Sequence, residues 1–291
     1  MTDSITPAER FQAVRGRLYG LAYRMVGSRA DAEDLVQEAY LRWHEADHDR
    51  IESAEAWLVT TTSRLALDRL RRLKTERDAY TGPWLPEPII GSSSSPAPAP
   101  DAHLDLADDL SMAFLTLLER LAPEERAAFL LHEVFEMDYR AIASVIGRSE
   151  AACRQVVHRA RERVRGERKR FDTTEAAKAA LLQRFLAAVE ARDEQALLSL
   201  FAPAATWTAD SGGKTPAAAR PILGADRIAR LVIGLREKFW VAGRHFEISV
   251  VNGETALCLL DGQRLVATMS IATDGQRIQA VYTVLNPDKL S

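Results

Sequence analysis

The segment 138–165 has the residue types and spacing needed to bind DNA. Apolar side chains recur at helical spacing in two short stretches, and between them Gly147 supplies a tight turn and Ser149 a cap for a second helix. The outward face of that second helix is basic. A helix of this width fits the major groove, where its N-terminal residues meet base edges and its basic flank meets phosphates. The expected DNA contacts are Arg148, Ser149, Arg154, Gln155, His158, Arg159 and Arg161.

Two more charged blocks lie earlier in the chain. Residues 31–52 carry eight acidic side chains against two basic ones, and residues 64–77 carry six basic side chains against two acidic ones. The basic block suits phosphate and the acidic block suits a basic protein surface. For each block the alternative is a solvated helix face without a partner. The net charge of -3 does not exclude nucleic acid, because the charges are segregated along the chain.

Helical periodicity predicts two helical regions, 8–77 and 105–170. Gly27 breaks the first region, and Ser28 can cap the helix that follows. Between the two regions, residues 78–104 contain several prolines and the run GSSSSPAPAP. Such a segment buries too little apolar surface to fold alone, so we expect an extended, flexible linker.

Residues 175–291 change to a mixed pattern. Helices are expected over 175–191, 194–201 and 225–238, before a β-rich tail. Three dipeptides in that tail, each Asn-Gly or Asp-Gly, separate runs of β-forming residues and are typical of two-residue hairpin turns. The prediction is an α+β domain with a four-stranded antiparallel meander over 245–251, 254–260, 263–273 and 276–285.

Composition excludes several classes of protein. No apolar run approaches the ~18 residues of a membrane span, and the N-terminus has no signal-peptide pattern. Cys153 and Cys258 lie far apart, which argues against a disulfide framework or a structural metal site and fits a cytoplasmic protein. We expect no cofactor and no membrane association. Only Asp210, His245 and Asp261 are candidates for acid–base catalysis, and their spacing assembles no site.

The helical regions resemble a known family. The run LERLAPEERAAFLLHEVFEMDYRAIA (118–143) and the helix pair after it resemble the promoter-recognition domain, sigma-4, of extracytoplasmic-function sigma factors. SRADAEDLVQEAYLRWHE (28–45) resembles the sigma-2 helix that grips the largest polymerase subunit. AEAWLVTTTSRLALDRLRR (54–72) resembles the segment that recognises and opens the promoter at its -10 element.

This resemblance implies roles for named residues. For two of the polymerase contacts, Leu35 and Leu41, burial in the domain's own core is the alternative; for Trp57 in the second segment, burial is the preferred interpretation. The implied polymerase contacts are Asp31, Asp34, Leu35, Gln37, Glu38 and Leu41. The implied -10 contacts are Thr60, Thr61, Arg64, Arg69, Arg71 and Arg72.

The rest of the chain resembles one subgroup of that family. WLPEP (84–88) and NPDKL (286–290), together with a SnoaL-like C-terminal domain, are similar to sigma factors that carry a fused regulatory extension. The loop 210–214 reads DSGGK here in place of a DGGGR-type sequence. The resemblance implies that the C-terminal domain acts in cis on the linker. The implied interdomain residues are Trp84, Leu85, Pro86, Asp210, Lys214, Asn286, Pro287 and Asp288.

The expected fold is therefore multidomain: two all-α helical domains, sigma-2 and sigma-4, and then an α+β cone-shaped SnoaL-like domain. The expected function is that of an RNA polymerase sigma factor, not an enzyme, whose partners are core RNA polymerase, promoter DNA and its own C-terminal domain. A separate anti-sigma protein stays an open question. Two rival classes are an ordinary helix-turn-helix regulator with a ligand-sensing pocket and a SnoaL-like enzyme with a helical appendage. Binding to core polymerase distinguishes a sigma factor from the ordinary regulator, which does not need that contact. Turnover of a polyketide or steroid-like substrate would support the enzyme.

Overall fold

The computed structural model describes residues 6–91, 110–168 and 173–290. The chain divides into two compact units, which we describe separately. The helical unit contains the chain up to Asp78 and Leu118–Val164. The C-terminal unit contains Arg165–Ser291 and two earlier stretches, Ala79–His103 and Asp109–Leu117. Residues that precede the helix-turn-helix in sequence therefore belong partly to the C-terminal unit.

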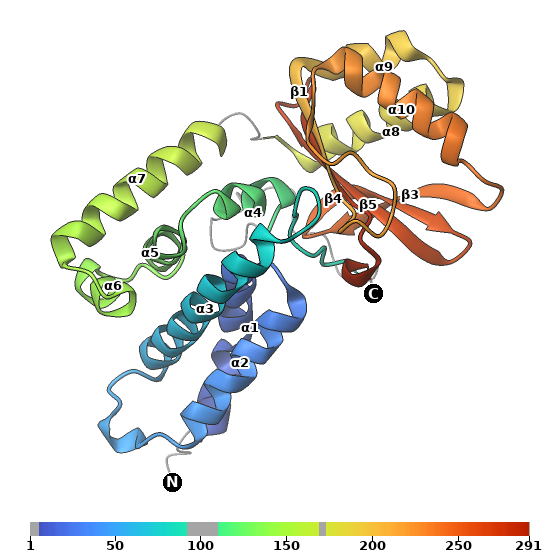
Figure 1. Cartoon of the computed structure of the whole chain (residues 1–291). Coiled ribbons are helices and arrows are strands. Elements are labelled where there is room, and N and C mark those ends of the chain that lie inside the picture. The colour runs from blue at the N-terminus through green and yellow to red at the C-terminus, as the bar shows by residue number, and fades with distance from the viewer. Residues whose placement is uncertain (1–5, 92–109, 169–172, 291) are drawn as a thin grey trace. The chain divides into compact units, whose positions relative to one another are not determined.

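Three long helices begin the helical unit (Figure 1). Thr6 and Glu9 form a reciprocal capping box at the first helix, and Gly27 ends it in the left-handed conformation with φ 71°. Ser28 caps the second helix through the amide of Asp31, as the sequence predicts. The helices are α1 (Pro7–Val26), α2 (Arg29–His44) and α3 (Ala54–Asp78), with the 3-10 turn η1 (His48–Arg50) between the last two.

Four more helices follow in the chain. Most of the first, α4, belongs to the C-terminal unit, whereas α5 and α6 pack against α3. One buried cation helps to hold this arrangement. The guanidinium of Arg126, 2% exposed, donates to the Met25 carbonyl at 2.6 Å and to Glu119 at 2.7 Å. A buried charge is tolerated only when it is paired and hydrogen-bonded in this way. The helices are α4 (Met112–Glu119), α5 (Pro123–Glu133), α6 (Tyr139–Ile146) and α7 (Glu150–Arg168).

The C-terminal unit is a six-stranded mixed sheet with three helices on one face (Figure 1). The strand order is β2-β1-β6-β5-β4-β3, and the three predicted hairpins form the antiparallel run from β3 to β6. The helices are α8 (Glu175–Ala191), α9 (Glu194–Leu200) and α10 (Ala225–Phe239). The strands are β1 (Phe201–Asp210), β2 (Ile222–Leu223), β3 (Arg244–Val251), β4 (Glu254–Asp261), β5 (Arg264–Thr273) and β6 (Ile278–Val284), followed by the 3-10 turn η2 (Pro287–Lys289).

The prediction of a four-stranded sheet was wrong by two strands. β1 runs parallel to β6 and antiparallel to the short β2. The sequence of β1, FAPAATWTAD, is rich in alanine and contains a proline, which are poor strand formers. Its strand conformation comes from pairing with β6, which is distant in sequence.

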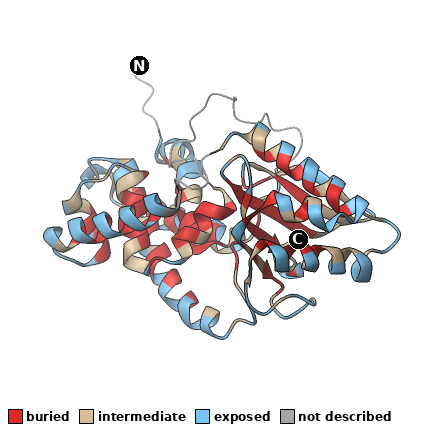
Figure 2. Cartoon of the chain, turned by 90° about the horizontal axis from the view of Figure 1, so that it is seen from above, coloured by how far each residue is buried: buried red, intermediate tan, exposed pale blue. Residues whose placement is uncertain are grey.

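Apolar clusters lie on both faces of the sheet, and Figure 2 shows buried residues along its strands. One face packs on α8, α9 and α10 through a large apolar cluster that includes Phe185, Trp207 and Val281. The opposite face of β6 contributes Tyr282 and Val284 to a smaller cluster. Because side chains alternate along a strand, β6 separates the two clusters.

The beginning of the predicted linker is not free. Leu85 is 1% exposed and packs with Met112 and Val284 in the smaller cluster. The amide of Gly91 donates to the Val250 carbonyl at 2.9 Å. For residues 79–91 the expectation of a mobile segment is therefore wrong, because three prolines and four large apolar residues suit a docked extended segment as well as a solvated one. The remaining linker residues, 92–104, and residues 105–109 of the predicted sigma-4 region lie outside the described ranges.

Candidate functional site

The helix-turn-helix forms from local signals. Asp138 caps α6 through the Ala141 amide at 2.7 Å, and Gly147 ends α6 at φ 70°. Ser149 accepts from the Ala152 amide at 3.3 Å at the start of α7. The inner face of α7 is lined by Cys153, Val156, Val157 and Ala160.

Six of the seven residues predicted to contact DNA from α7 and its turn lie on the exposed face. Arg161 differs: its guanidinium holds Glu133 of α5, with Nε at 2.9 Å, and its side chain is 29% exposed. Arg154 is exposed but pairs with Glu150 and lies over the ring of Tyr139. Arg159 makes no hydrogen bond or ion pair to any residue in the described ranges. The exposed residues are Arg148, Ser149, Arg154, Gln155, His158 and Arg159.

The acidic helix α2 divides its predicted polymerase contacts between surface and core. Leu35 is 8% exposed, so the interpretation as a contact is wrong and the alternative, burial in the core, holds. Leu41 is 50% exposed, and Asp34 and Gln37 are also exposed. Glu38 pairs with Arg42 one turn later, at 2.9 Å. An exposed leucine rimmed by carboxylates is the composition of a docking face.

Most of the basic side chains on α3 have partners within the helical unit. Arg64 donates to the carbonyl and hydroxyl of Ser144 on α6, at 3.2 and 3.1 Å. Arg71 pairs with Glu124 of α5 at 2.8 Å. Arg69 pairs with Asp31 at 2.8 Å and with Glu76. Arg72 is exposed, and Thr60 and Thr61 are half-buried.

A buried carboxylate organises the C-terminal unit. Asp210, 0% exposed, accepts from the Tyr80 hydroxyl at 2.5 Å, from the Leu85 amide at 2.8 Å and from the Lys289 ammonium at 2.7 Å. Burial, together with the hydrogen bond to this carboxylate, raises the pKa of Tyr80 far above its usual value, so the phenol remains a donor. The WLPEP segment and the C-terminal NPDKL segment therefore both bond to the Asp210 carboxylate.

Lys289 strengthens this meeting point. Its ammonium also donates to the Leu85 carbonyl at 2.6 Å and lies 4.1 Å from the centre of the Trp84 ring. Asn286 donates to the Tyr80 hydroxyl at 2.9 Å. At the surface, Lys214 pairs with Asp288.

Asn252 attaches the linker to the sheet at a second place, and it both donates to and accepts from Ile89. Its backbone amide donates to the Ile89 carbonyl at 2.7 Å, and its side-chain oxygen accepts from the Ile89 amide at 2.6 Å. Its side-chain nitrogen donates to the Leu110 carbonyl at 2.9 Å. One side chain thus joins Ile89, inside the predicted linker, to Leu110, which follows it in the chain. We name Asp210, Asn252, Asn286 and Lys289 the linker clamp.

Comparison with known proteins identifies the chain. The description "Sigma-70 region 2" matches residues 10–76, and "Sigma-70, region 4" matches residues 111–164. The ECF RNA polymerase sigma factor SigJ of Mycobacterium tuberculosis H37Rv is 39% identical, over 97% of this chain and 92% of its own length. The chain belongs to the extracytoplasmic-function sigma factors.

The likeness extends through the fused domain. The crystal structure of M. tuberculosis SigJ superposes with a TM-score of 0.75 at 38% identity, covering 97% of each chain. SigI of M. tuberculosis CDC 1551 is 29% identical over 99% of this chain and 95% of its own length. The predicted family, fold class and function in promoter-specific transcription are confirmed, and core RNA polymerase and promoter DNA are the partners of this sigma factor.

The candidate catalytic residues of the sigma factor do not come together. Asp210 is occupied by the clamp, Asp261 pairs with Arg244 at 3.3 Å, and the exposed His245 contacts Glu247 at 3.1 Å. Across the described ranges there is no group of side chains able to hold a metal ion and no helix long and apolar enough to cross a membrane.

Sequence reasoning missed three members of the sites. Lys289 lies inside the NPDKL run, and its membership of that run was the available signal. Asn252 was noticed only as a hairpin turn residue, which its φ of 56° confirms. Tyr80 carried no local signal, because its partners lie 130 and 206 positions away.

Proposed function

We propose that the C-terminal domain of this sigma factor regulates transcription initiation in cis by holding the segment between the sigma-2 and sigma-4 helices at Leu85, Ile89 and Leu110. The proposed domains are 8–77 for polymerase and the -10 element, 105–170 for the -35 element, and 175–291 for regulation. Asp34, Gln37, Glu38 and Leu41 would meet polymerase, α3 would meet the -10 element, and the exposed residues of α7 would meet the -35 element. The sigma factor would act in the cytoplasm, with its polymerase.

The observation that carries the regulatory proposal is the double attachment of Asn252. Ile89 and Leu110 bond to the same asparagine, and Leu85 shares an apolar cluster with Met112. While both bonds hold, Ile89 and Leu110 stay close together. The chain between them therefore cannot extend to increase the distance between the two DNA-binding regions.

Released, the linker would be long enough for a promoter. The 23 residues from Asp78 to Pro100 would span roughly 70 Å at about 3.1 Å each. Two helical turns of DNA measure roughly 68 Å. Release would thus allow both DNA-binding helices to engage one duplex, and linkage would raise their effective concentration.

Contacts inside the helical unit support a restrained state. Arg64 and Arg71 hold Ser144 and Glu124, so each must exchange a protein partner for a phosphate before it can bind DNA. Both arginines are exposed, and such contacts contribute only about 0–1 kcal/mol. The contacts of Arg64 and Arg71 would therefore break readily once the linker is released.

We also propose that the sigma factor catalyses no reaction of its own. The three acid–base candidates are separated and engaged elsewhere, which leaves no general base beside a substrate site. The clamp supplies restraint within the chain, so a separate anti-sigma protein is not required for this mechanism.

Transcription in vitro with core polymerase tests the proposal. Asn252→Gly and Asp210→Asn should each raise promoter-specific transcript several-fold at limiting sigma factor, while Gln263→Gly, an exposed turn control, should not. Circular dichroism would verify that each variant is folded. Transcript levels that stay unchanged or fall in both folded clamp variants would reject regulation by restraint.

Binding to polymerase is tested separately. Asp34→Lys should abolish co-purification with core polymerase, whereas Glu52→Gln, an exposed change outside α2, should not. Retained co-purification of Asp34→Lys would reject the assignment of α2 as the polymerase-binding helix.

A further inference from the structure

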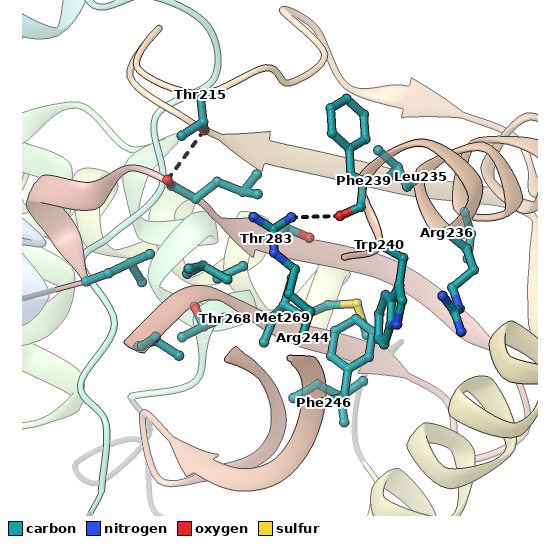
Figure 3. A pocket seen from close by; sticks show the side chains of 18 of the residues that line it. Thr215, Leu235, Arg236, Phe239, Trp240, Arg244, Phe246, Thr268, Met269 and Thr283 are labelled. Atoms are coloured by element: carbon teal, nitrogen blue, oxygen red, sulfur yellow. Dashed lines mark hydrogen bonds between the residues drawn. The ribbon is translucent and has the colours of Figure 1, made fainter. Parts of the chain in front are cut away.

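A large cavity lies within the C-terminal domain, between α10 and the helix-covered face of the sheet. Its volume is about 600 Å³, within the range of small-molecule sites. Aromatic rings form much of its wall, among them Phe239, Trp240 and Phe246 (Figure 3). Trp207 also lines it. Such a wall suits a ring-containing apolar molecule.

The ionisable groups in the wall have one sign. They are Arg236, Arg244 and Arg264, and no aspartate, glutamate or histidine of the described chain joins them. Arg244 is partly neutralised by Asp261 and donates to the Phe239 carbonyl at 2.8 Å (Figure 3). Arg236 lies 4.0 Å from the centre of the Trp240 ring, and neither Arg236 nor Arg264 forms an ion pair with another described residue. The cavity therefore attracts an anion.

Two buried polar atoms of the wall have no hydrogen-bond partner among the described residues. They are Nε of Arg236 and Oγ1 of Thr283. Thr283 is 7% exposed and lies on β6. A buried polar group without a partner destabilises the fold, so these atoms suit a ligand that supplies hydrogen bonds.

We propose that the cavity binds an organic anion with an apolar ring body, whose charged group lies at the arginines and whose body lies against the aromatic wall. The absence of a carboxylate or imidazole from the described wall leaves no general base, so the site is one for binding and not for turnover.

The cavity shares its wall with the linker clamp. On β6, Thr283 faces the cavity while Tyr282 and Val284 pack on the other side with Leu85. Pro287 and Leu290 also line the cavity, and they flank Lys289, which holds Asp210 and Leu85. The wall is complete only while the C-terminal segment is docked.

A ligand in the cavity should therefore favour the clamped state. A molecule that contacts Pro287 and Leu290 binds better when they are in place, and by linkage it stabilises the contacts that keep them there. This second part of the proposal rests on the clamp function proposed above. The ligand would act as a repressing signal for the sigma factor.

Fluorescence titration of the full chain tests binding without polymerase or DNA. The probes are 8-anilinonaphthalene-1-sulfonate, an aromatic anion, and N-phenyl-1-naphthylamine, its uncharged counterpart. We expect saturable 1:1 binding of the anion. Arg236→Met and Arg264→Met should each weaken the anion about tenfold and change the neutral probe less than twofold. Arg220→Met, an exposed arginine outside the cavity, should change neither.

Equal anion affinity in wild type and both cavity variants, or non-saturable binding, would overturn the site. The link to the clamp is measured with Asp210→Asn, which should weaken both probes at least threefold because Lys289 loses its carboxylate. Unchanged affinity in Asp210→Asn would overturn the link and leave the binding site standing. A failure of the clamp to regulate transcription would be seen in the polymerase assay alone.

Discussion

The linker and the predicted DNA-binding arginines of α3 are held by contacts of different strength. In the helical unit, the Arg71 side chain is 47% exposed, and that of its partner Glu124 on α5 is 26% exposed. In the C-terminal unit, the linker is held at a carboxylate that is 0% exposed and at an ammonium that is 12% exposed. Exposed pairs contribute about 0–1 kcal/mol, whereas removing one partner of a buried pair costs about 3–5 kcal/mol.

This difference assigns distinct roles to the two sets of contacts. The contacts on α3 can exchange for DNA phosphates at little cost. The clamp does not open without an input of free energy, which polymerase binding or a change in the cavity would have to supply. Control of this sigma factor should therefore reside in the C-terminal unit.

The largest effect should follow removal of the buried charge. Asp210→Asn removes the buried carboxylate that pairs with Lys289 and should destabilise the docked linker by about 3–5 kcal/mol. Hydrogen exchange at the Leu85 and Gly91 amides would report the loss of protection. The matched control is Asp288→Asn, whose exposed pair with Lys214 should contribute less than about 1 kcal/mol. Equal loss of protection in Asp210→Asn and Asp288→Asn would show that the buried pair is no stronger than an exposed one.

Truncation of the buried apolar anchor should come next. Leu85→Ala removes a side chain that is 1% exposed and should cost about 2–5 kcal/mol of docking. Limited proteolysis within residues 79–91 would detect the released segment. Ile90→Ala, at a side chain that is 39% exposed, should leave the cleavage rate near that of wild type.

A smaller effect is expected at the second attachment. Asn252→Gly keeps the positive φ but removes the side-chain bonds to Ile89 and Leu110, at a cost of about 1–3 kcal/mol. Hydrogen exchange at the Ile89 amide measures this cost against Gln263→Gly. Protection that persists in Asn252→Gly would mean that the backbone bonds alone hold the linker.

The smallest effect should come from the helical unit. Glu124→Gln weakens the hold on Arg71 and should tighten binding to promoter DNA by no more than about fivefold. Fluorescence anisotropy with a labelled -10 oligonucleotide measures it, with Glu52→Gln as control. A gain of a hundredfold would show that the α3 contacts, and not the clamp, restrain the sigma factor.

Much of the fold could be predicted because it depends on neighbours in sequence. The caps at Ser28, Asp138 and Ser149 and the turn at Gly147 define the helices of the helical unit. The Asn-Gly and Asp-Gly turns define three hairpins. β1 escaped prediction because its alanine-rich sequence becomes a strand only through pairing with β6.

The candidate sites divide in the same way. The basic face of α7 and the acidic face of α2 follow from periodicity, since a helix presents its exposed face wherever it packs. Whether a given side chain on that face is free does not follow: Leu35 lies in the core and Arg161 holds Glu133 because of helices that pack from elsewhere in the chain.

Local patterns in the residues thus predict the DNA-binding helix pair, the acidic helix and the β-hairpins, because capping, turn geometry and periodicity act over a few positions. The clamp depends on contacts between positions 79 to 206 apart, from Lys289–Asp210 to Asn286–Tyr80. The tertiary packing decides which residues become partners. Burial excludes water from Asp210 and so strengthens its hydrogen bonds with Tyr80 and Lys289.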